Sequence, residues 1–396
     1  MSEWPTVRLG EVADLLAGYP FPSAEFTENQ ADPRLLRGDN VGQGALRWGG
    51  AKRWPARRVD GLDDYWLQRD DVILAMDRPW IEAGLKFAAV RESDLPSLLV
   101  QRVSRIRGGS RLDRRYLKHV IASRSFTDHI LSVQTGTTIP HISAKQILDF
   151  EFRLPPIAEQ WRIAGILGAL DDKIELNRQR TERLDQAARA IFQDWFISSP
   201  VAASWPGFRL ADVFDVNPMR PLPRTAPAPY LDMANMPTSG PSALAIATRI
   251  PGSGARFENG DTLLARITPC LENGKTALVD FLAPGERGWG STEYIVLRPR
   301  DPLPDPFAYC LARQPDFVSY AVARMNGSSG RQRVSAAAIG EFEIRTPPPE
   351  LARRFGDVVG PMFQRITLAG RESNTLADIR ELLLPRLLSG PIERAA

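Results

Sequence analysis

The sequence predicts an α+β protein with two similar α/β domains, each followed by a long helix, and with the two helices paired as an antiparallel coiled coil. Three observations predict this fold class. The stretch EFRLPP at 151–156 recurs as EIRTPP at 343–348, and the apolar pattern after each stretch keeps one register at a shift of 192 residues. The regions before them hold short apolar runs divided by Gly and Pro. Such a repeat indicates a duplicated domain-and-helix unit.

The repeat also sets the expected domain boundaries: a first domain over 1–154, a first helix over 155–199, a second domain over 200–346 and a second helix over 347–396. Weaker matches link the two domains. VRLGEVADL at 7–15 matches FRLADVFDV at 208–216, DDVILAMDRPW at 70–80 matches GDTLLARITPC at 260–270, and TGTTIPHIS at 135–143 matches NGSSGRQRVS at 326–335. Short apolar runs such as VILAM and YIVLRP predict short strands.

Apolar residues recur at alternating steps of three and four through both helical segments, which is the pattern of a coiled coil. The predicted seam of the first helix is Ile163, Leu167, Leu170, Ile174, Asn177, Thr181, Leu184, Ala188, Ile191 and Trp195. The predicted seam of the second is Phe355, Val359, Met362, Ile366, Ala369, Ser373, Leu376, Ile379 or Arg380, Leu383 and Leu387. A helix of roughly 40 residues spans about 60 Å and needs a partner for its apolar stripe. The duplicate helix is the obvious partner.

An antiparallel pairing is preferred because a parallel one needs a return connection as long as the helices, although the second domain could supply it. The other interpretation is a pair of ordinary core helices. Pro361 is expected to kink or split the second helix, since proline removes a backbone hydrogen bond. The acidic residues Asp171, Asp172 and Glu175 are expected to face water.

Composition excludes several classes of protein. The 396 residues carry a formal net charge of only +3, so any nucleic-acid surface must come from local clusters. Two cysteines exclude a disulfide framework, and the N-terminus shows no signal-peptide pattern. No apolar run approaches the length of a membrane span. We expect a cytoplasmic protein.

Local charge favours a nucleic-acid surface in both domains. Basic residues gather in RWGGAKRWPARR at 47–58, in RVSRIRGGSRLDRRYLK at 102–118 and in RMNGSSGRQR at 324–333. Glycines let a backbone approach a phosphate, and arginine can fork onto a guanine edge. A solvated charged face is the alternative for any one cluster. Clusters that recur around a duplicated Gly–hydroxyl loop favour DNA.

Catalytic motifs are incomplete. NPMR at 217–220 lacks the second proline and the aromatic residue that an amino-methyltransferase tetrapeptide needs. PCLENGKT at 269–276 lacks the first glycine of a phosphate loop, and the run after it predicts a strand rather than a helix. Lys275 is then a DNA contact or a solvated loop lysine. None of the histidines His119, His129 and His141 has metal-site spacing. We expect a non-catalytic scaffold that reads DNA.

The stretch LPPIAEQWRIAGILGALDDKIELNRQ resembles the central region of the specificity (S) subunits of type I restriction–modification systems. GDTLLARITPCLENGKTALV, STEYIVLRP and NGSSGRQRVS extend the resemblance through the second half. The resemblance implies two target-recognition domains, each reading one half of a bipartite DNA target. It implies helices that set the spacer and dock two modification subunits, and restriction subunits beyond them. S-adenosylmethionine, ATP and Mg²⁺ are expected on those partners, and this chain is expected to hold no cofactor or metal.

The resemblance also directs the choice of contact residues. In the first domain, the expected DNA contacts are Lys52, Arg53, Arg78, Trp80, Lys86, Thr137, Thr138 and His141. In the second, they are Arg266, Thr268, Lys275, Ser328, Ser329, Arg331 and Arg333. Partner docking is expected at Trp161, Gln193, Trp195 and Phe196, with ordinary packing as the alternative. Two other functions stay open: a self-contained methyltransferase or nuclease, and a coiled-coil adaptor that does not touch DNA.

Overall fold

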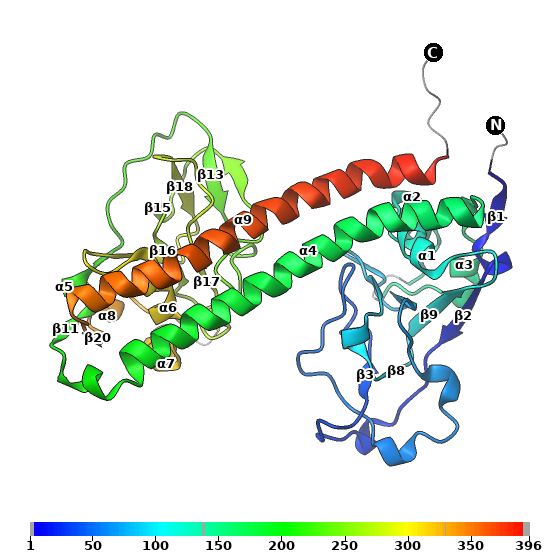
Figure 1. Ribbon diagram of the computed structural model, residues 1–396, viewed down its shortest axis with the longest axis horizontal. Coiled ribbons are helices and arrows are strands. Elements are labelled where there is room, and N and C mark those ends of the chain that lie inside the picture. Colours follow the sequence, from blue (N-terminus) through cyan, green and yellow to red (C-terminus); the bar gives the residue numbers. More distant parts are fainter. Residues whose placement is uncertain (1–3, 137–138, 329, 391–396) are drawn as a thin grey trace. The chain divides into compact units, whose positions relative to one another are not determined.

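The computed structural model describes residues 4–136, 139–328 and 330–390 (Figure 1). The chain forms two compact units. Unit 1 combines Met1–Asp172 with Leu376–Ala396, and unit 2 is Lys173–Thr375. Each unit contains a domain rich in short strands and a portion of each long helix, so the predicted α+β fold class is confirmed.

Unit 1 is built on a four-stranded antiparallel sheet with the order β2-β9-β4-β7. These strands are β2 (Ala13–Ala17), β9 (Val103–Gly108), β4 (Val72–Ala75) and β7 (Phe87–Ala89). Smaller pairs join β3 (Arg34–Leu36) to β8 (Ser97–Leu99), β5 (Trp80–Ile81) to β6 (Gly84–Leu85), and β1 (Thr6–Arg8) to β10 (Glu151–Arg153). The helices of this domain are α1 (Arg114–Ile121), α2 (Arg124–Val133) and α3 (Ala144–Leu148). Its core is apolar, and Leu74, Ile106 and Tyr116 are fully buried there.

Unit 2 repeats this plan. Its sheet has the order β12-β19-β16-β17, formed by β12 (Phe214–Val216), β19 (Tyr294–Pro299), β16 (Thr262–Ala265) and β17 (Thr276–Leu278). A second sheet joins β14 (Ala247–Arg249), β13 (Ala228–Leu231), β18 (Arg287–Gly290) and β15 (Arg256–Glu258), and β11 (Gly207–Arg209) pairs with β20 (Glu343–Arg345). The helices are α5 (Leu210–Val213), α6 (Asp305–Ala312), α7 (Pro315–Ala323) and α8 (Ala336–Gly340). In both units the last strand of the main sheet in sequence lies between the first and the second, as a duplication requires.

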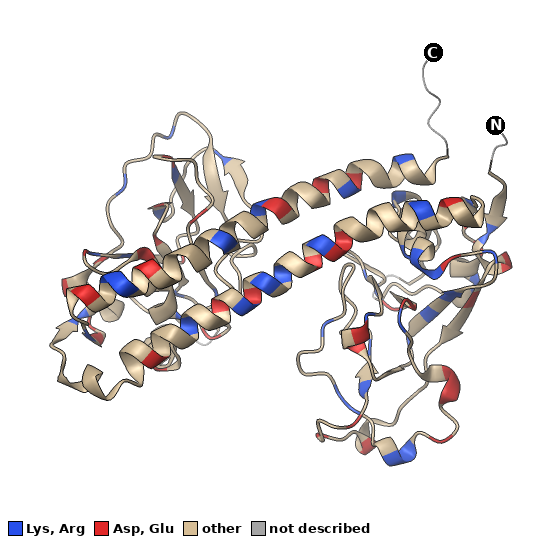
Figure 2. Cartoon of the chain, viewed as in Figure 1, with Lys and Arg blue, Asp and Glu red and all other residues tan. Residues whose placement is uncertain are grey.

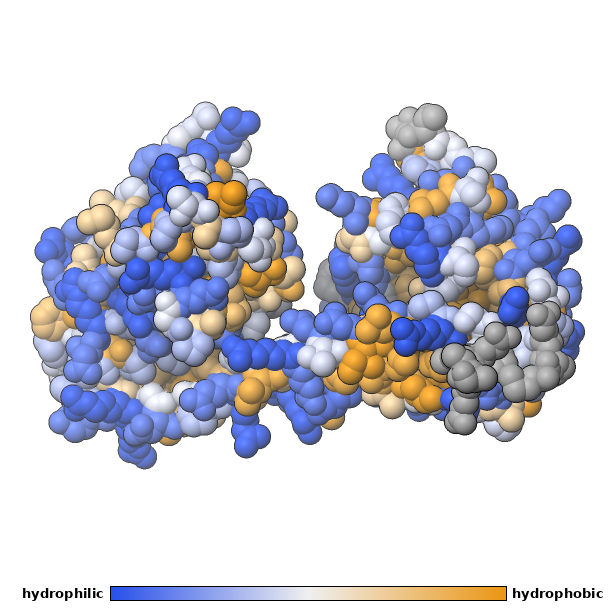
Figure 3. Space-filling view, turned by 90° about the horizontal axis from the view of Figure 1, so that it is seen from above, coloured by the Kyte–Doolittle hydropathy of each residue, from blue (hydrophilic) through white to orange (hydrophobic). Residues whose placement is uncertain are grey.

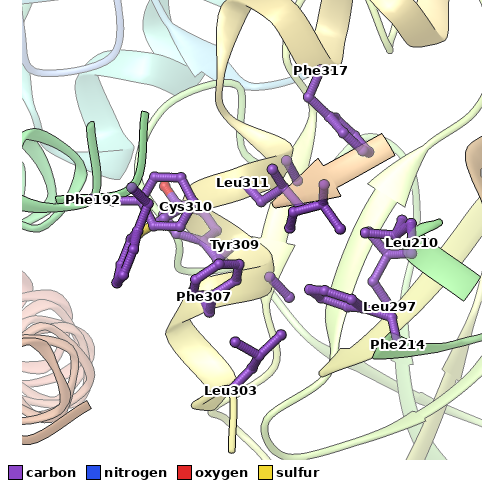
Figure 4. Packing of buried hydrophobic residues seen from close by; sticks show 14 of the residues in the cluster. Phe192, Leu210, Phe214, Leu297, Leu303, Phe307, Tyr309, Cys310, Leu311 and Phe317 are labelled. Atoms are coloured by element: carbon purple, nitrogen blue, oxygen red, sulfur yellow. The ribbon is translucent and has the colours of Figure 1, made fainter. Parts of the chain in front are cut away.

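The core of unit 2 lies where helix α6 meets the sheet and the long helices. Figure 4 shows Phe307, Tyr309 and Leu311 of α6 with Phe192 and Leu297. Phe192 contacts Phe307 and Phe355 edge to face, with ring centroids 4.9 and 5.8 Å apart. Burial of such aromatic side chains is the main term that ties the helices to the domain.

The long helices are α4 (Ile157–Phe192), which ends in a π-helical turn over Gln193–Ile197, and α9 (Pro349–Leu388). Their portions run antiparallel within each unit. In unit 2, Asn177 donates to Glu372 while Phe192, further along α4, packs on Phe355 at the start of α9. The predicted antiparallel pairing is thus confirmed. No helix within the described ranges is long and apolar enough to cross a membrane.

The predicted seams match the burial pattern. Every seam residue of α4 is buried or half-buried, and Ile163, Leu167 and Ala188 are fully buried. In α9 the choice between Ile379 and Arg380 is settled, because Ile379 is 39% exposed while Arg380 turns inward to an ion pair.

The expected split at Pro361 is wrong. Helix α9 runs through this residue as one 40-residue helix. Pro361 is exposed, while Val359 and Phe363 beside it are buried against the core of unit 2. An interior proline costs a helix about 3 kcal/mol, and burial of two flanking apolar side chains offsets a cost of that size.

The expectation that Asp171 faces water is also wrong. Its side chain is only 12% exposed and forms ion pairs with Lys118 of α1 and, at 2.9 Å, with Arg380 of α9. Burial opposes ionisation, but the two cations together lower the pKa of the Asp171 carboxyl. This largely buried carboxylate beside the heptad seam therefore joins α4, α9 and the first domain through two ion pairs.

Candidate nucleic-acid interface

In both units a loop folds back onto the end of a central strand of the main sheet. The loop at 135–141 follows α2 in unit 1, and the loop at 326–333 follows α7 in unit 2. We call them the first and second recognition loops. Each is closed by an antiparallel bridge, Thr135 with His141 and Asn326 with Arg333. His141 and Arg333 also bridge to Asp77 and Ile267, just beyond strands β4 and β16.

Backbone hydrogen bonds place the two loops in one register. The Ile142 amide donates to the Met76 carbonyl at 2.9 Å, and the Val334 amide donates to the Arg266 carbonyl at 3.0 Å. Met76 and Arg266 are therefore equivalent positions. By the same pattern Arg78, whose amide donates to Pro140, is equivalent to Thr268, whose amide donates to Gln332.

An ion pair fixes the base of the first recognition loop. His141 Nδ1 lies 2.6 Å from Asp77 Oδ1, and Arg102 Nη1 donates to Asp77 Oδ2 at 3.0 Å. Arg78 next to it holds a φ of 45°, a left-handed conformation that is costly for a side chain other than glycine. Arg78 is exposed, and its guanidinium has no partner among the described residues.

A different ion pair fixes the second recognition loop. The guanidinium of Arg333 forks onto Glu293, with Nε at 2.9 Å and Nη2 at 2.7 Å from Oε1. The hydrogen bond to Glu293 raises the pKa of Arg333, so its charge is secure. Glu293 comes directly before β19, as Arg102 comes directly before β9, so the carboxylate here occupies the place that an arginine holds in unit 1.

The remaining loop residues lie at the surface. Ser328 and Arg331 are exposed, and the Arg331 amide donates to the Ser328 carbonyl at 3.0 Å. Arg331 has no side-chain partner in the described part of the chain. Thr137, Thr138 and Ser329 lie outside the described residues. The structure thus brings Arg78 and His141 together in unit 1, and Ser328, Arg331 and Arg333 together in unit 2.

Two predicted lysines have an internal role. Lys86 Nζ donates to the Gly38 carbonyl, and Lys275 Nζ donates to the Met233 carbonyl at 2.5 Å. They stand at equivalent positions, immediately before β7 and β17. Desolvation lowers the pKa of Lys86. Each ammonium already ties a loop to its sheet, so DNA contact by either lysine stays a prediction that requires this bond to be shared.

The other predicted contacts are partly engaged as well. Lys52 pairs with Glu28 at 3.4 Å, and Arg53 donates to the Asp32 carbonyl at 2.6 Å. Trp80 is half-buried against the core of unit 1. The Thr268 hydroxyl donates to Glu272 at 2.9 Å. DNA contact by these four residues stays a prediction, and the contacts above show how each side chain is held in the free chain.

The predicted docking residues divide into exposed and packed. Trp161 on α4 is 55% exposed. Trp195 packs edge to face on Phe355 and lies under the Arg354 guanidinium, and Phe196 is only 5% exposed within the core of unit 2. Gln193 donates to the Ser198 hydroxyl at 3.0 Å. Packing therefore accounts for Phe196, and Trp161 is the one of the four that presents a large apolar surface.

The incomplete catalytic motifs have structural roles. Asn217 accepts a hydrogen bond from the Val296 amide at 2.8 Å and so ends strand β12. PCLENGKT leads into strand β17, as expected, and no helix N-terminus follows it. Burial lowers the pKa of His119 to about 3, which leaves it neutral in the core of unit 1. Within the described residues no group of three or more His, Cys, Asp or Glu side chains could hold a metal ion.

Sequence reasoning missed Asp77, Arg102 and Glu293, the residues that hold the two loops. Asp77 follows the predicted strand VILAM and Glu293 precedes the predicted strand YIVLRP, which was a weak signal, and Arg102 had no such signal. Their partners lie 64, 25 and 40 residues away, so the pairing could not be seen along the sequence.

Comparison with known proteins gives one family. Residues 1–186 match the model of the type I restriction modification DNA specificity domain. The chain is 30% identical over 190 residues to the type I restriction enzyme MjaVIII specificity subunit of Methanocaldococcus jannaschii, a match that covers 48% of this chain and 44% of the relative. It is 35% identical over 170 residues to the EcoAI specificity subunit of Escherichia coli, covering 42% and 28% of the two chains. These two matches therefore span less than half of either relative.

Two matches are longer. The HindI specificity subunit of Haemophilus influenzae is 23% identical over 353 residues, covering 70% of this chain and 77% of the relative. The crystal structure of a type I restriction–modification S subunit from M. genitalium aligns over 98% of this chain and 97% of its own, with a TM-score of 0.59 and 16% identity, and it shows the same fold. Residues 1–186 thus resemble the DNA specificity domain of type I restriction–modification systems, and the chain as a whole is similar in fold to an S subunit of such a system.

Proposed function

We propose that this chain reads DNA for a type I restriction–modification complex, with each recognition domain contacting one half of a bipartite, asymmetric target. The observation that carries the proposal is the duplicated recognition loop. Both loops are anchored by backbone bridges at equivalent places on two copies of one sheet, and each brings an exposed arginine to that region, Arg78 beside the first loop and Arg331 within the second. Two copies with different side chains suit two half-sites of different sequence.

The chemistry of the loops fits DNA. Exposed arginines without an acidic partner, Arg78 in unit 1 and Arg331 in unit 2, can fork onto a guanine edge or a phosphate. Loop glycines at positive φ, Gly136 and Gly327, let the backbone turn tightly enough to enter a groove. The residues that hold the loops keep them rigid, which reduces the entropy lost on binding.

We further propose that α4 and α9 set the spacer between the half-sites and dock two modification subunits that methylate adenine at N6. Basic and acidic residues follow one another along both helices (Figure 2). One face of the molecule carries an apolar patch (Figure 3). On the two helices, the exposed apolar side chains include Trp161 and Ile166 of α4 and Leu368 and Leu382 of α9. Exposed apolar groups beside charge are typical of a protein interface. S-adenosylmethionine would bind to the modification subunits, and ATP and Mg²⁺ to restriction subunits.

Reconstitution tests this function. The full chain is combined with the modification subunits and S-adenosylmethionine, and the methylated DNA is sequenced at single-molecule level. The expected result is one asymmetric bipartite motif that appears only when both components are present. Methylation or cleavage by the chain alone would favour a self-contained enzyme. A complex that assembles but shows no salt-dependent duplex binding would favour an adaptor.

A further inference from the structure

Unit 2 contains a cavity of about 890 Å³ beside the second recognition loop. It is lined by strand β19, by Arg266 directly after β16, by the segment 254–256 at the start of β15 and by the segment 217–221. The side chains that matter here are Met219, Arg220, Arg256, Arg266 and Thr292. Met219 is 99% exposed at its rim, so the cavity opens to solvent.

The charges in this cavity are unbalanced. Arg220 already forms two internal ion pairs, at 2.6 Å with Asp261 and at 2.5 Å with Glu258. Among the described residues, the Arg256 guanidinium donates a hydrogen bond only to the backbone oxygen of Arg220, at 3.4 Å. Arg256 and Arg266 have no carboxylate partner in the described residues, and no acidic side chain lines the cavity. Two guanidinium charges therefore face a space that favours an anion.

Arg266 also carries an unsatisfied donor. Its Nε is shielded from solvent and has no hydrogen-bond partner among the described residues. A buried donor without an acceptor costs about 1–3 kcal/mol, more when the group is charged. Such a group at the edge of a cavity indicates that an acceptor arrives from outside the chain.

The cavity is continuous with the recognition loop. The Arg266 amide donates to the Glu293 carbonyl at 3.0 Å, and the Arg266 carbonyl accepts from Val334. Thr292 in the lining adjoins Glu293, which holds Arg333. The equivalent of Arg266 in unit 1 is Met76, which is buried and uncharged. The cationic cavity thus belongs to the second domain.

We propose that this cavity seats one backbone phosphate of the DNA, held by Arg256 and Arg266. The donors suit a phosphate because guanidinium groups and the Thr292 hydroxyl supply N–H and O–H bonds and a phosphate supplies only acceptors. The apolar part of the lining, including Pro218 and Met219, suits the neighbouring sugar. The inference rests on the proposed DNA-reading function and adds a positioning contact that only the second domain has.

The test measures duplex binding by the reconstituted complex at several salt concentrations, with Arg256→Gln, Arg266→Gln and the conservative Arg266→Lys. Exposed Arg353 on α9 has no ion pair in the described residues, so Arg353→Gln is a control with the same change of charge. The duplex is also prepared with a single neutral methylphosphonate at each successive position of the second half-site.

The expected result is that Arg256→Gln and Arg266→Gln each reduce the slope of log affinity against log salt, by at most about 0.9, the effect of one phosphate contact, while Arg353→Gln and Arg266→Lys change it less. A methylphosphonate at one position should weaken duplex binding by the parent complex and should not weaken binding by the Arg266→Gln complex any further. The methylated motif should stay the same.

Three outcomes overturn the proposal. In the first, the two glutamine variants change the salt slope no more than Arg353→Gln does. In the second, every methylphosphonate weakens duplex binding additively with Arg266→Gln. In the third, the glutamine variants relax the sequence specificity at the second half-site, which would make Arg266 a base-reading residue. A complex in which no variant and no parent binds duplex would instead refute the proposed function itself.

Discussion

The two recognition loops leave their sheets at equivalent positions, yet different charges hold them. In unit 1 the carboxylate of Asp77 lies beyond β4 and takes His141 and Arg102. In unit 2 the carboxylate of Glu293 lies before β19 and takes Arg333 alone. Only the backbone bridges are common to both. The comparison teaches that the fold specifies the backbone frame of a recognition loop and leaves its side chains free to differ, as two half-sites require.

The largest effect is expected from charge reversal at Glu293. In Glu293→Arg two guanidinium groups would meet where an ion pair stood, and the second loop would leave its place. We expect about a 100-fold loss of methylation by the reconstituted complex, corresponding to about 2.7 kcal/mol. The double variant Glu293→Arg with Arg333→Glu restores the ion pair, and it should recover loop protection from hydrogen exchange but not DNA binding if Arg333 also contacts DNA. Failure of the double variant to recover protection would show that Glu293 does not position the loop.

The second largest effect is expected at Asp171, which pairs α4 with α9 in unit 1. Asp171→Asn leaves Lys118 and Arg380 without a carboxylate, and removing one partner of a largely buried pair is destabilising. We expect a loss of about 2 kcal/mol at pH 7, discounted because Arg380 is partly exposed. Hydrogen exchange at pH 7 should localise the loss to unit 1. A uniform loss in both units would contradict the assignment.

The same residue gives a pH dependence. The folded pKa of Asp171 lies below its unfolded value of about 3.9, because Lys118 and Arg380 outweigh the opposing effect of burial. Its contribution is therefore present above that unfolded value and is lost as the pH falls through the lower folded pKa. The urea midpoints of the parent and Asp171→Asn should differ at pH 7 and converge below about pH 4. A difference that persists at low pH would show that the substitution acts through packing instead.

Much of the frame was open to prediction because it depends on local patterns. The proline-initiated helices, their heptads and the duplicated strands follow from spacing along the sequence. The seam follows from those heptads, and its antiparallel direction from the long return connection that a parallel pairing would need. Asp171 was misjudged because an acid on a helix faces water unless distant cations meet it, and Lys118 and Arg380 come from other segments. The predicted split at Pro361 was wrong because the burial of Val359 and Phe363 depends on a domain that the helical pattern does not contain.

The candidate site was harder to predict for the same physical reason. Arg331 and Arg333 stood out as basic residues near glycine, but their roles differ: Arg331 is exposed and Arg333 is held by Glu293. Similarly, Lys86 and Lys275 were chosen by charge, while in the fold each binds a backbone carbonyl. Composition identifies which groups can contact DNA, and tertiary contacts decide which of them are available.

A smaller effect is expected at Asp77. Asp77→Asn removes the carboxylate from His141 and Arg102 but keeps a side chain of the same shape, and both partners are well exposed to solvent. We expect about a tenfold loss of methylation, which corresponds to about 1.4 kcal/mol. The loss should be confined to recognition of the first half-site, with single-molecule sequencing showing relaxed bases there and an unchanged second half-site. Relaxation of both half-sites would mean that the loops do not act independently.

The smallest effect is expected at Asn177, where a neutral amide of α4 rather than a carboxylate contacts α9 in unit 2. Asn177 is buried on the α4 seam and donates to Glu372 at 2.8 Å and to the Ser373 hydroxyl at 3.3 Å. Asn177→Leu removes these bonds but adds apolar surface at a heptad position, so the two effects nearly cancel, and the free energy of unfolding should change by less than about 1 kcal/mol. The register in which α4 and α9 pair should become less well defined instead, because a polar seam residue specifies which turns of two helices meet. Cysteines placed at Thr181 and Ala369, on the two seams, would report the change: cross-linking efficient in the parent and reduced in Asn177→Leu supports a register role, and equal cross-linking with a large loss of stability contradicts it.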